Sequence, residues 1–400
     1  MSPIRRRLAV GIAAPAAIAL GLGLRWTAHA DTETAASGCQ AASEMYEVCL
    51  TNPDKYEDGA DLTIVDRLRE YVQSAEADSV VHGAMFLWEL CADGDQDCTE
   101  VPEIRGLVDD LVAAQNERGV DVKLVVGNYE GRNDETMRLL READIPLTVC
   151  TSGCLPNGDG QKEGLMHMKF FTFSDGDQVR VVHTSSNLSD AQLKRHQNLL
   201  SVTGDQALYD NYVGFWNRMN VGSWTYDGVE WKGEDRAPLG DAPGLKSYFF
   251  PRTEADPVRG TLELLECQDG ADRVWASASL FHTDERLPVL KVLDDLESSG
   301  CDVRVIVALA EHKEWIDVNS DLDNVRVLDG AGEVWHSHHN KLIVTDALYQ
   351  GEERHAVYAG SHNLNTGSLR LSSDGMLRVA DEAVFNLYAD YYEEMYALAG

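Results

Sequence analysis

Two segments of the chain repeat a histidine and a lysine at the same short spacing. His167 and Lys169 stand in the order H-x-K, and His339 and Lys341 repeat that order in the second half. A histidine titrates near neutral pH and can act as a base, an acid or a nucleophile, while a lysine supplies positive charge. The two pairs therefore indicate a site for an anionic substrate such as a phosphodiester.

A strand and a short polar turn follow each H-x-K pair. A serine and an asparagine occupy matching positions in the two turns: Ser185, Asn187, Ser361 and Asn363. Side chains two apart on a strand share a face, so we expect the histidine and lysine of each pair to point the same way. The serine and asparagine side chains would then bind the phosphoryl oxygens or orient the histidines.

The duplicated pattern resembles the two HKD motifs of the phospholipase D superfamily, over a region from about Ala60 to Tyr396. The second motif is complete, because Asp346 follows at the family spacing. The first motif departs from the pattern, with Ser174 at the position of the acid and Thr184 in place of a glycine. These departures put the local geometry of the first motif in doubt more than its activity.

The resemblance implies a role for each member of the two motifs. It makes His167 the nucleophile that forms a covalent phosphohistidine and His339 the general acid. Lys169 and Lys341 would supply positive charge, and Asp346 would complete the second motif. The residues alone leave the order of the two histidines open.

Two further polar residues stand where the family places hydrogen-bond partners of the catalytic imidazoles. These are Asn198 in the first half and Asp374 in the second. A carboxylate near an imidazole favours its charged form. If each partner served its own half, Asp374 would make His339 the better acid and leave His167 as the nucleophile.

A histidine cluster next to the second motif raises the alternative of a metal site. His336, His338 and His339 are close in sequence, but only the first two share a strand face, and no acidic residue lies nearby. Zinc sites need three or four well-placed ligands. We therefore expect no metal and no cofactor.

The chain of 400 residues has a formal net charge of −33, from 34 basic and 67 acidic residues. Such a surface repels polyanions, although a local basic pocket can persist within it. We therefore do not expect nucleic acid as a partner. We expect a monomer that contacts a membrane surface transiently.

The first thirty residues have the pattern of an export signal. Three arginines precede an apolar run that ends in Ala28-His29-Ala30, a small-residue cleavage site. We predict a signal peptide at residues 1–30, a leader at 31–59 and a secreted protein. An uncleaved anchor is the alternative, and the export route, Sec or twin-arginine, stays open.

Eight cysteines follow the predicted signal peptide, and an even number in an exported chain favours disulfides. Six of them fall in close pairs, which suggests Cys39–Cys49, Cys91–Cys98 and Cys150–Cys154. By elimination, Cys267 pairs with Cys301.

Apolar strand patterns alternate with helical patterns through both halves, which predicts an α/β fold. The length exceeds that of a usual single core, and the motif is duplicated. We predict two α/β/α sandwich units, residues 60–223 and 257–400, joined by a linker at 224–256. They would meet about a pseudo-twofold axis with one shared active site.

These observations favour a secreted, metal-independent phosphodiesterase resembling phospholipase D. It would act on phospholipid head groups by hydrolysis or transphosphatidylation. One alternative is an endonuclease of the same superfamily. The other is a non-catalytic envelope or binding protein that keeps the fold.

Overall fold

The computed structural model describes residues 38–56, 59–92, 98–176, 178–231, 244–268, 272–330 and 337–400. All of them belong to one compact unit, residues 36–400. The predicted signal peptide at residues 1–30 and His336 lie outside the described residues.

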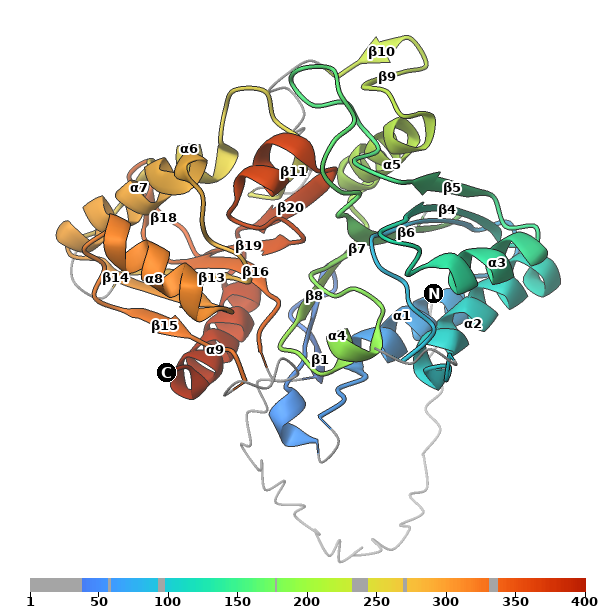
Figure 1. Cartoon of the computed structure of the whole chain (residues 1–400), viewed down its shortest axis with the longest axis horizontal. Coiled ribbons are helices and arrows are strands. Elements are labelled where there is room, and N and C mark those ends of the chain that lie inside the picture. The colour runs from blue at the N-terminus through green and yellow to red at the C-terminus, as the bar shows by residue number, and fades with distance from the viewer. Residues whose placement is uncertain are drawn as a thin grey trace, which may run out of the picture. The chain divides into compact units, whose positions relative to one another are not determined.

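A mixed sheet organises the first half (Figure 1). Three of its strands, β3, β4 and β5, run parallel, and the other neighbours pair antiparallel. In spatial order the strands are β1 (Gly38–Ala41), β2 (Tyr46–Leu50), β8 (Asn198–Thr203), β7 (Gln178–Thr184), β6 (Lys169–Asp175), β3 (Val80–Met85), β4 (Asp121–Gly127) and β5 (Leu147–Cys150).

The second half repeats this plan from β2 onward, and β1 has no counterpart among the described strands of the second sheet. Again three neighbouring strands run parallel, β13, β14 and β15, and the others pair antiparallel. In spatial order the strands are β11 (Lys246–Phe250), β20 (Asp374–Val379), β19 (Ala356–Gly360), β16 (Lys341–Thr345), β13 (Arg273–Ala278), β14 (Asp302–Val307) and β15 (Val325–Val327). The matching order confirms the predicted duplicated α/β fold.

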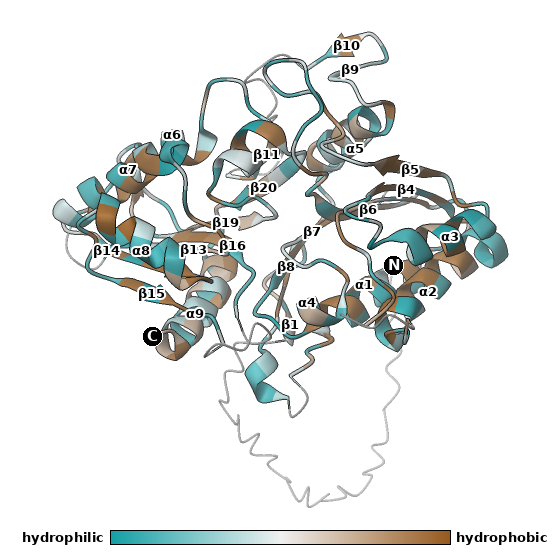
Figure 2. Cartoon of the chain, viewed as in Figure 1, coloured by the Kyte–Doolittle hydropathy of each residue, from teal (hydrophilic) through white to brown (hydrophobic). Residues whose placement is uncertain are grey.

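Helices cover the sheets because their apolar faces must be buried. In the first half they are α1 (Thr63–Ser74), α2 (Pro102–Arg118), α3 (Asp134–Glu142), α4 (Asp190–Leu193) and α5 (Gln206–Val221). In the second half they are α6 (Pro257–Leu262), α7 (Leu287–Ser298), α8 (Ala310–Asn319) and α9 (Glu382–Leu398). Apolar residues, brown in Figure 2, are concentrated on the strands and on parts of the helices that cover them.

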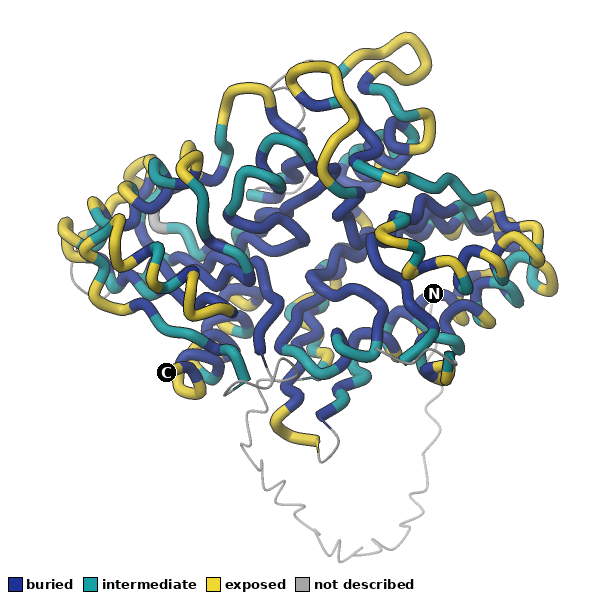
Figure 3. Tube along the Cα trace, in the orientation of Figure 1, coloured by how far each residue is buried: buried dark blue, intermediate teal, exposed yellow. Residues whose placement is uncertain are grey.

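One core cluster joins the two halves. It combines side chains of α5 and α9 with strands of both sheets, for example Phe170, Leu200, Tyr212, Leu377 and Tyr388. The central strands are accordingly buried along most of their length (Figure 3). The H-x-K segments of the two halves therefore lead into strands that share one core cluster.

The segment 224–256, predicted as a linker, carries regular structure of its own. It contains the hairpin β9 (Thr225–Tyr226) and β10 (Val229–Glu230), and also β11, which pairs with β20. The predicted leader likewise contains β1 and β2 of the first sheet. A small separate sheet consists of β12 (Leu265–Glu266), β17 (Leu348–Tyr349) and β18 (Glu352–Glu353).

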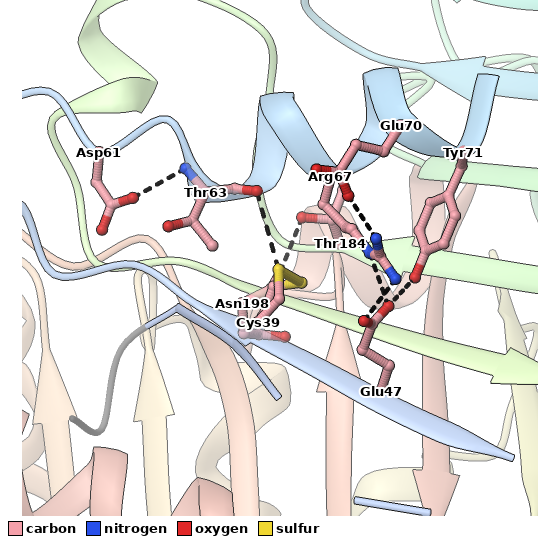
Figure 4. Close-up of a disulfide and its surroundings, with 10 residues drawn as sticks. Cys39, Glu47, Asp61, Thr63, Arg67, Glu70, Tyr71, Thr184 and Asn198 are labelled. Atoms are coloured by element: carbon pink, nitrogen blue, oxygen red, sulfur yellow. Dashed lines mark hydrogen bonds and ion pairs between the residues drawn. A yellow bond between two sulfur atoms is a disulfide. The ribbon is translucent and has the colours of Figure 1, made fainter. Parts of the chain in front are cut away.

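All four predicted disulfides are present: Cys39–Cys49, Cys91–Cys98, Cys150–Cys154 and Cys267–Cys301. The first links β1 to β2 (Figure 4). Beside it, Glu47 of β2 accepts hydrogen bonds from Arg67 and Tyr71 of α1, which ties this edge of the sheet to the helix. Within the described ranges, no helix is both long and apolar enough to cross a membrane.

Candidate active site

The two H-x-K pairs adopt the same local geometry. Lys169 is the first residue of β6 and Lys341 the first of β16, so both histidines lie just before their strands. Each lysine folds back, and its Nζ donates to the carbonyl oxygen of the histidine two residues earlier, at 2.6 Å in both halves. The position of each lysine relative to its histidine therefore depends on this hydrogen bond as well as on the alternation of side chains along a strand.

A segment of the opposite half holds each histidine. The backbone N–H of His167 donates to the carbonyl oxygen of Ser373 at 2.8 Å. In the same way, the N–H of His339 donates to the carbonyl oxygen of His196 at 2.9 Å. The β-bridges Met166–Ser373 and His196–His338 accompany these bonds. The two motifs thus meet in one site.

The residues that follow Ser373 and His196 reach the imidazoles. Asp374 Oδ2 lies 3.1 Å from His167 Nδ1. Gln197 Oε1 lies 3.2 Å from His339 Nδ1, and the carbonyl oxygen of Ser185 lies 3.1 Å from the same nitrogen. One imidazole therefore has a carboxylate beside it and the other has neutral acceptors.

This arrangement corrects the prediction that Asp374 and Asn198 serve the histidines of their own halves. Asp374 contacts the histidine of the first motif, 207 positions away in sequence. Asn198 contacts neither imidazole: its Nδ2 donates to Asn340 Oδ1 at 2.6 Å, and its Oδ1 accepts from the Tyr388 hydroxyl. Gln197, which the sequence did not single out, occupies the position equivalent to Asp374.

An inserted residue explains why sequence spacing selected Asn198. Thirteen positions separate Ser185 from Asn198, and thirteen also separate Ser361 from Asp374. In the structure, however, Ser185 Oγ donates to Gln197 Oε1 at 2.9 Å, twelve positions away, and Ser361 Oγ donates to Asp374 Oδ1. The second half has one additional residue here, in a segment that includes the π-helical turn Gly367–Leu371.

The serines and asparagines of the two turns are all buried. Ser185 and Ser361 orient the groups beside the histidines, as the two hydroxyl contacts show. The side-chain oxygens of Asn187 and Asn363 have no hydrogen-bond partner within the described part of the chain. Both amides therefore keep hydrogen-bonding capacity at equivalent positions in the two halves.

Asp346, predicted with the catalytic set, lies at the opposite end of β16 from Lys341. Its Oδ1 accepts from the backbone N–H of Arg273 at 2.6 Å, and its Oδ2 pairs with the guanidinium at 2.6 Å. Five strand residues span about 16 Å, so this carboxylate is remote from the histidines. It fastens β16 to β13 instead.

Burial and the two lysines determine the charges of the site. Burial, with Lys169 nearby, lowers the pKa of His167 to about 4, although Asp374 opposes the shift. Burial also lowers the pKa of Lys169 to about 7. Burial by itself would raise the pKa of Asp374, but His167, His362 and Lys169 hold it below its usual range. At neutral pH the carboxylate is therefore charged beside a neutral His167.

The second motif is likewise buried, and burial together with Lys341 lowers the pKa of His339 well below its ordinary value. Burial and Lys169 lower the pKa of Lys341 well below its ordinary value in the same way. An entering phosphate would add negative charge and favour the protonated forms of these groups. The site is thus arranged to bind an anion.

His338 belongs to the histidine cluster that raised the alternative of a metal site. It is fully buried, and its Nδ1 lies 3.2 Å from the hydroxyl of Ser277. Among the residues that the structure describes, no group of three histidine, cysteine or acidic side chains is placed to hold a metal ion.

The second half of the chain, residues 264–396, matches the family model described as "Cardiolipin synthase, PLD-like domain". Over these residues the chain is similar to a phospholipase D-like domain. This match includes the whole second motif, and the duplicated sheet order extends the same architecture to the first half. No curated protein matches the chain.

Several solved structures resemble this chain in fold. Polyphosphate kinase from Porphyromonas gingivalis has 13% identity and a TM-score of 0.54 over 89% of this chain and 52% of the kinase. The chain thus spans about half the length of the kinase, and the likeness shows a shared fold. Nuc from Salmonella typhimurium, a phospholipase D family member, has 18% identity and a TM-score of 0.29 over 43% of this chain and 90% of Nuc. Yeast tyrosyl-DNA phosphodiesterase has 11% identity and a TM-score of 0.47 over 80% and 88%.

Proposed function

We propose that this protein is a secreted phosphodiesterase that removes or exchanges phospholipid head groups through a phosphohistidine intermediate. The observation that carries the proposal is the unequal pair of imidazoles in one site. His167 has the carboxylate of Asp374 beside it, whereas His339 has neutral oxygens.

His167 is suited to attack phosphorus. An ionised Asp374 accepts the Nδ1 proton of a neutral His167, which leaves the lone pair on Nε2. The carboxylate then stabilises the positive charge that the ring gains when Nε2 bonds to phosphorus. This supports the nucleophile assignment by a different route from the one expected, because the acid serves the nucleophile and not the general acid.

His339 is suited to move a proton. The carbonyl oxygen of Ser185 and Gln197 Oε1 accept its Nδ1 proton, so Nε2 can carry the second proton when phosphate binds. It gives that proton to the leaving alcohol as the P–O bond breaks, and it then takes a proton from water or from a second alcohol. Lys169 and Lys341 neutralise the phosphoryl oxygens.

Three observations support a phospholipid as the substrate. The matching family model is named for an enzyme that forms a phospholipid. The net charge of −33 opposes the approach of long polyanions such as DNA. The four disulfides are consistent with a protein that works outside the cell.

A product assay on the purified mature chain tests the proposal. The substrates are phosphatidylcholine and phosphatidylglycerol vesicles, a cyclic phosphodiester and DNA, with and without a primary alcohol and with and without EDTA. We expect free head group and, with alcohol, the exchanged phospholipid, both insensitive to EDTA. His167→Asn is the inactive control. Cleavage of DNA with intact lipids would favour the nuclease alternative, and no turnover of any substrate would favour the binding protein.

A further inference from the structure

The third residue of the second polar turn differs from its counterpart in the first. His362 follows Ser361, whereas Ser186 follows Ser185. Ser186 is satisfied locally, because its hydroxyl donates to the carbonyl oxygen of Asn187 and its N–H donates to Thr184 Oγ1. His362 instead lies beside Asp374, with its Nδ1 4.0 Å from Asp374 Oδ2. The residue beside the carboxylate thus differs between the two halves.

A buried arginine determines which nitrogen of His362 carries the proton. Arg286 Nη2 lies 2.6 Å from His362 Nε2, and both side chains are almost completely buried. A guanidinium has only donors, so Nε2 must accept, and the proton of the neutral ring sits on Nδ1. Arg286 is anchored in turn by Asp256, at 2.5 Å. Its position is therefore fixed from the start of α6, where Asp256 also caps the helix.

Packing fixes the plane of the His362 ring. The ring of Phe250 stacks on it with centroids 3.7 Å apart and an interplanar angle of 14°. His362 Nδ1 has no hydrogen-bond partner within the described residues. A buried N–H without a partner is costly, and the nearest charged group is the carboxylate of Asp374, at 4.0 Å.

We propose that His362, locked by Arg286 as the Nδ1–H tautomer, is a positioning residue that keeps Asp374 ionised and aligned with His167. This rests on the proposed phosphodiesterase reaction. The carboxylate then accepts hydrogen bonds from Ser361 and Gly375 at Oδ1 and from His167 at Oδ2, and His362 Nδ1 lies 4.0 Å from Oδ2. His362 adds a dipole beside Asp374 without adding a charge that would repel the cationic phosphohistidine.

The first half supports the assignment by contrast. Gln197 occupies the position of Asp374 there and is neutral, so it requires no stabilisation of a charge. Ser186 at the equivalent turn position hydrogen-bonds to Thr184 and Asn187 instead. The titratable and charged groups around His362 are Arg286, Asp374, His167 and Arg252, and burial with Arg286 lowers the pKa of His362 well below its ordinary value. The ring therefore stays neutral at the pH of the assay.

Two substitutions test the roles of the two ring nitrogens of His362 separately. In His362→Asn the amide N–H lies near the position of Nδ1 and can still donate toward Asp374, whereas in His362→Gln the amide lies near Nε2 and satisfies Arg286 only. With bis(p-nitrophenyl) phosphate as the probe, we expect the glutamine variant to lose about tenfold to a hundredfold in kcat. The asparagine variant should retain most of the rate. His82→Gln, another buried histidine substitution but distant from Asp374, should stay near wild type.

A double-mutant cycle distinguishes positioning from general damage. If His362 acts only through Asp374, then His362→Gln should change the rate less than about twofold in an Asp374→Asn background. Equal losses in both backgrounds would overturn the proposal, and so would a wild-type rate in His362→Gln. Circular dichroism and thermal melts confirm that each variant is folded.

A second measurement does not depend on activity. Nitrogen-15 NMR of histidine-labelled wild-type protein reports the tautomer of His362, assigned by its loss in His362→Gln. We expect the neutral Nδ1–H form at pH 7. An Nε2–H form or an imidazolium would overturn the proposal even if the protein cleaves phosphodiesters. If the NMR result is as expected and no phosphodiester is cleaved, it is the proposed function that fails.

Discussion

Replacing Asp374 by asparagine tests the central geometry, because the structure dictates how the new amide must lie. The hydroxyl of Ser361 and the N–H of Gly375 both donate to Oδ1. The amide oxygen must therefore take the Oδ1 position, and the amide NH2 must replace Oδ2, 3.1 Å from His167 Nδ1. Two donors cannot face each other, so His167 is forced to accept at Nδ1 and to carry its proton on Nε2.

The forced tautomer removes the lone pair that attacks phosphorus. The analogous substitution in a serine protease triad lowers kcat about 10⁴-fold by the same tautomer effect. Here we expect a loss of about 10³- to 10⁴-fold, which corresponds to about 4–5.5 kcal/mol of transition-state stabilisation. The volume of the side chain is unchanged, so the fold should persist.

The assay is rapid-quench kinetics with bis(p-nitrophenyl) phosphate, which reports the burst of p-nitrophenolate and the acid-labile phosphate on histidine. Asp374→Asn should show neither at wild-type rates. Gln197→Asn is the matched control on the other imidazole, and it should lose much less because p-nitrophenolate leaves without a proton. If Asp374→Asn turns over within tenfold of wild type with an intact burst, then the carboxylate does not control the tautomer of the nucleophile.

Three further outcomes follow from the same geometry. His339→Asn should slow an alkyl phosphodiester by at least about a hundredfold while still forming phosphohistidine from a p-nitrophenyl ester; acid-labile phosphate mapped to His339 in wild type would reverse the roles. The value of kcat/KM should fall below about pH 4, as His167 gains a proton, and above about pH 7, as Lys169 loses its charge. A profile that stays flat up to pH 9 would contradict the role of Lys169 in the alkaline fall. Asp346→Asn should leave kcat within about threefold of wild type. It should lower the free energy of unfolding by about 1–2 kcal/mol, because it weakens the ion pair with the partly exposed Arg273. A large loss of kcat in folded protein would show instead that Asp346 takes part in catalysis.

The sequence by itself determined the features that short-range patterns encode. The duplicated H-x-K segments and polar turns predicted two α/β units, and the strand order of the two sheets confirms them. Close cysteine spacing predicted three disulfides, and elimination predicted Cys267–Cys301, which is also present. Apolar periodicity depends only on residues close in sequence, so it can be recognised without knowledge of the tertiary fold.

Only the tertiary structure decided which side chains meet across the two halves. The pairing of His167 with Asp374 joins positions 207 apart, and it depends on how the shared core packs the sheets together. Sequence spacing chose Asn198 over Gln197 because one inserted residue near the π-helical turn shifts the register. On an extended segment, neighbouring side chains point to opposite faces, so a shift of one residue replaces the side chain that faces the imidazole.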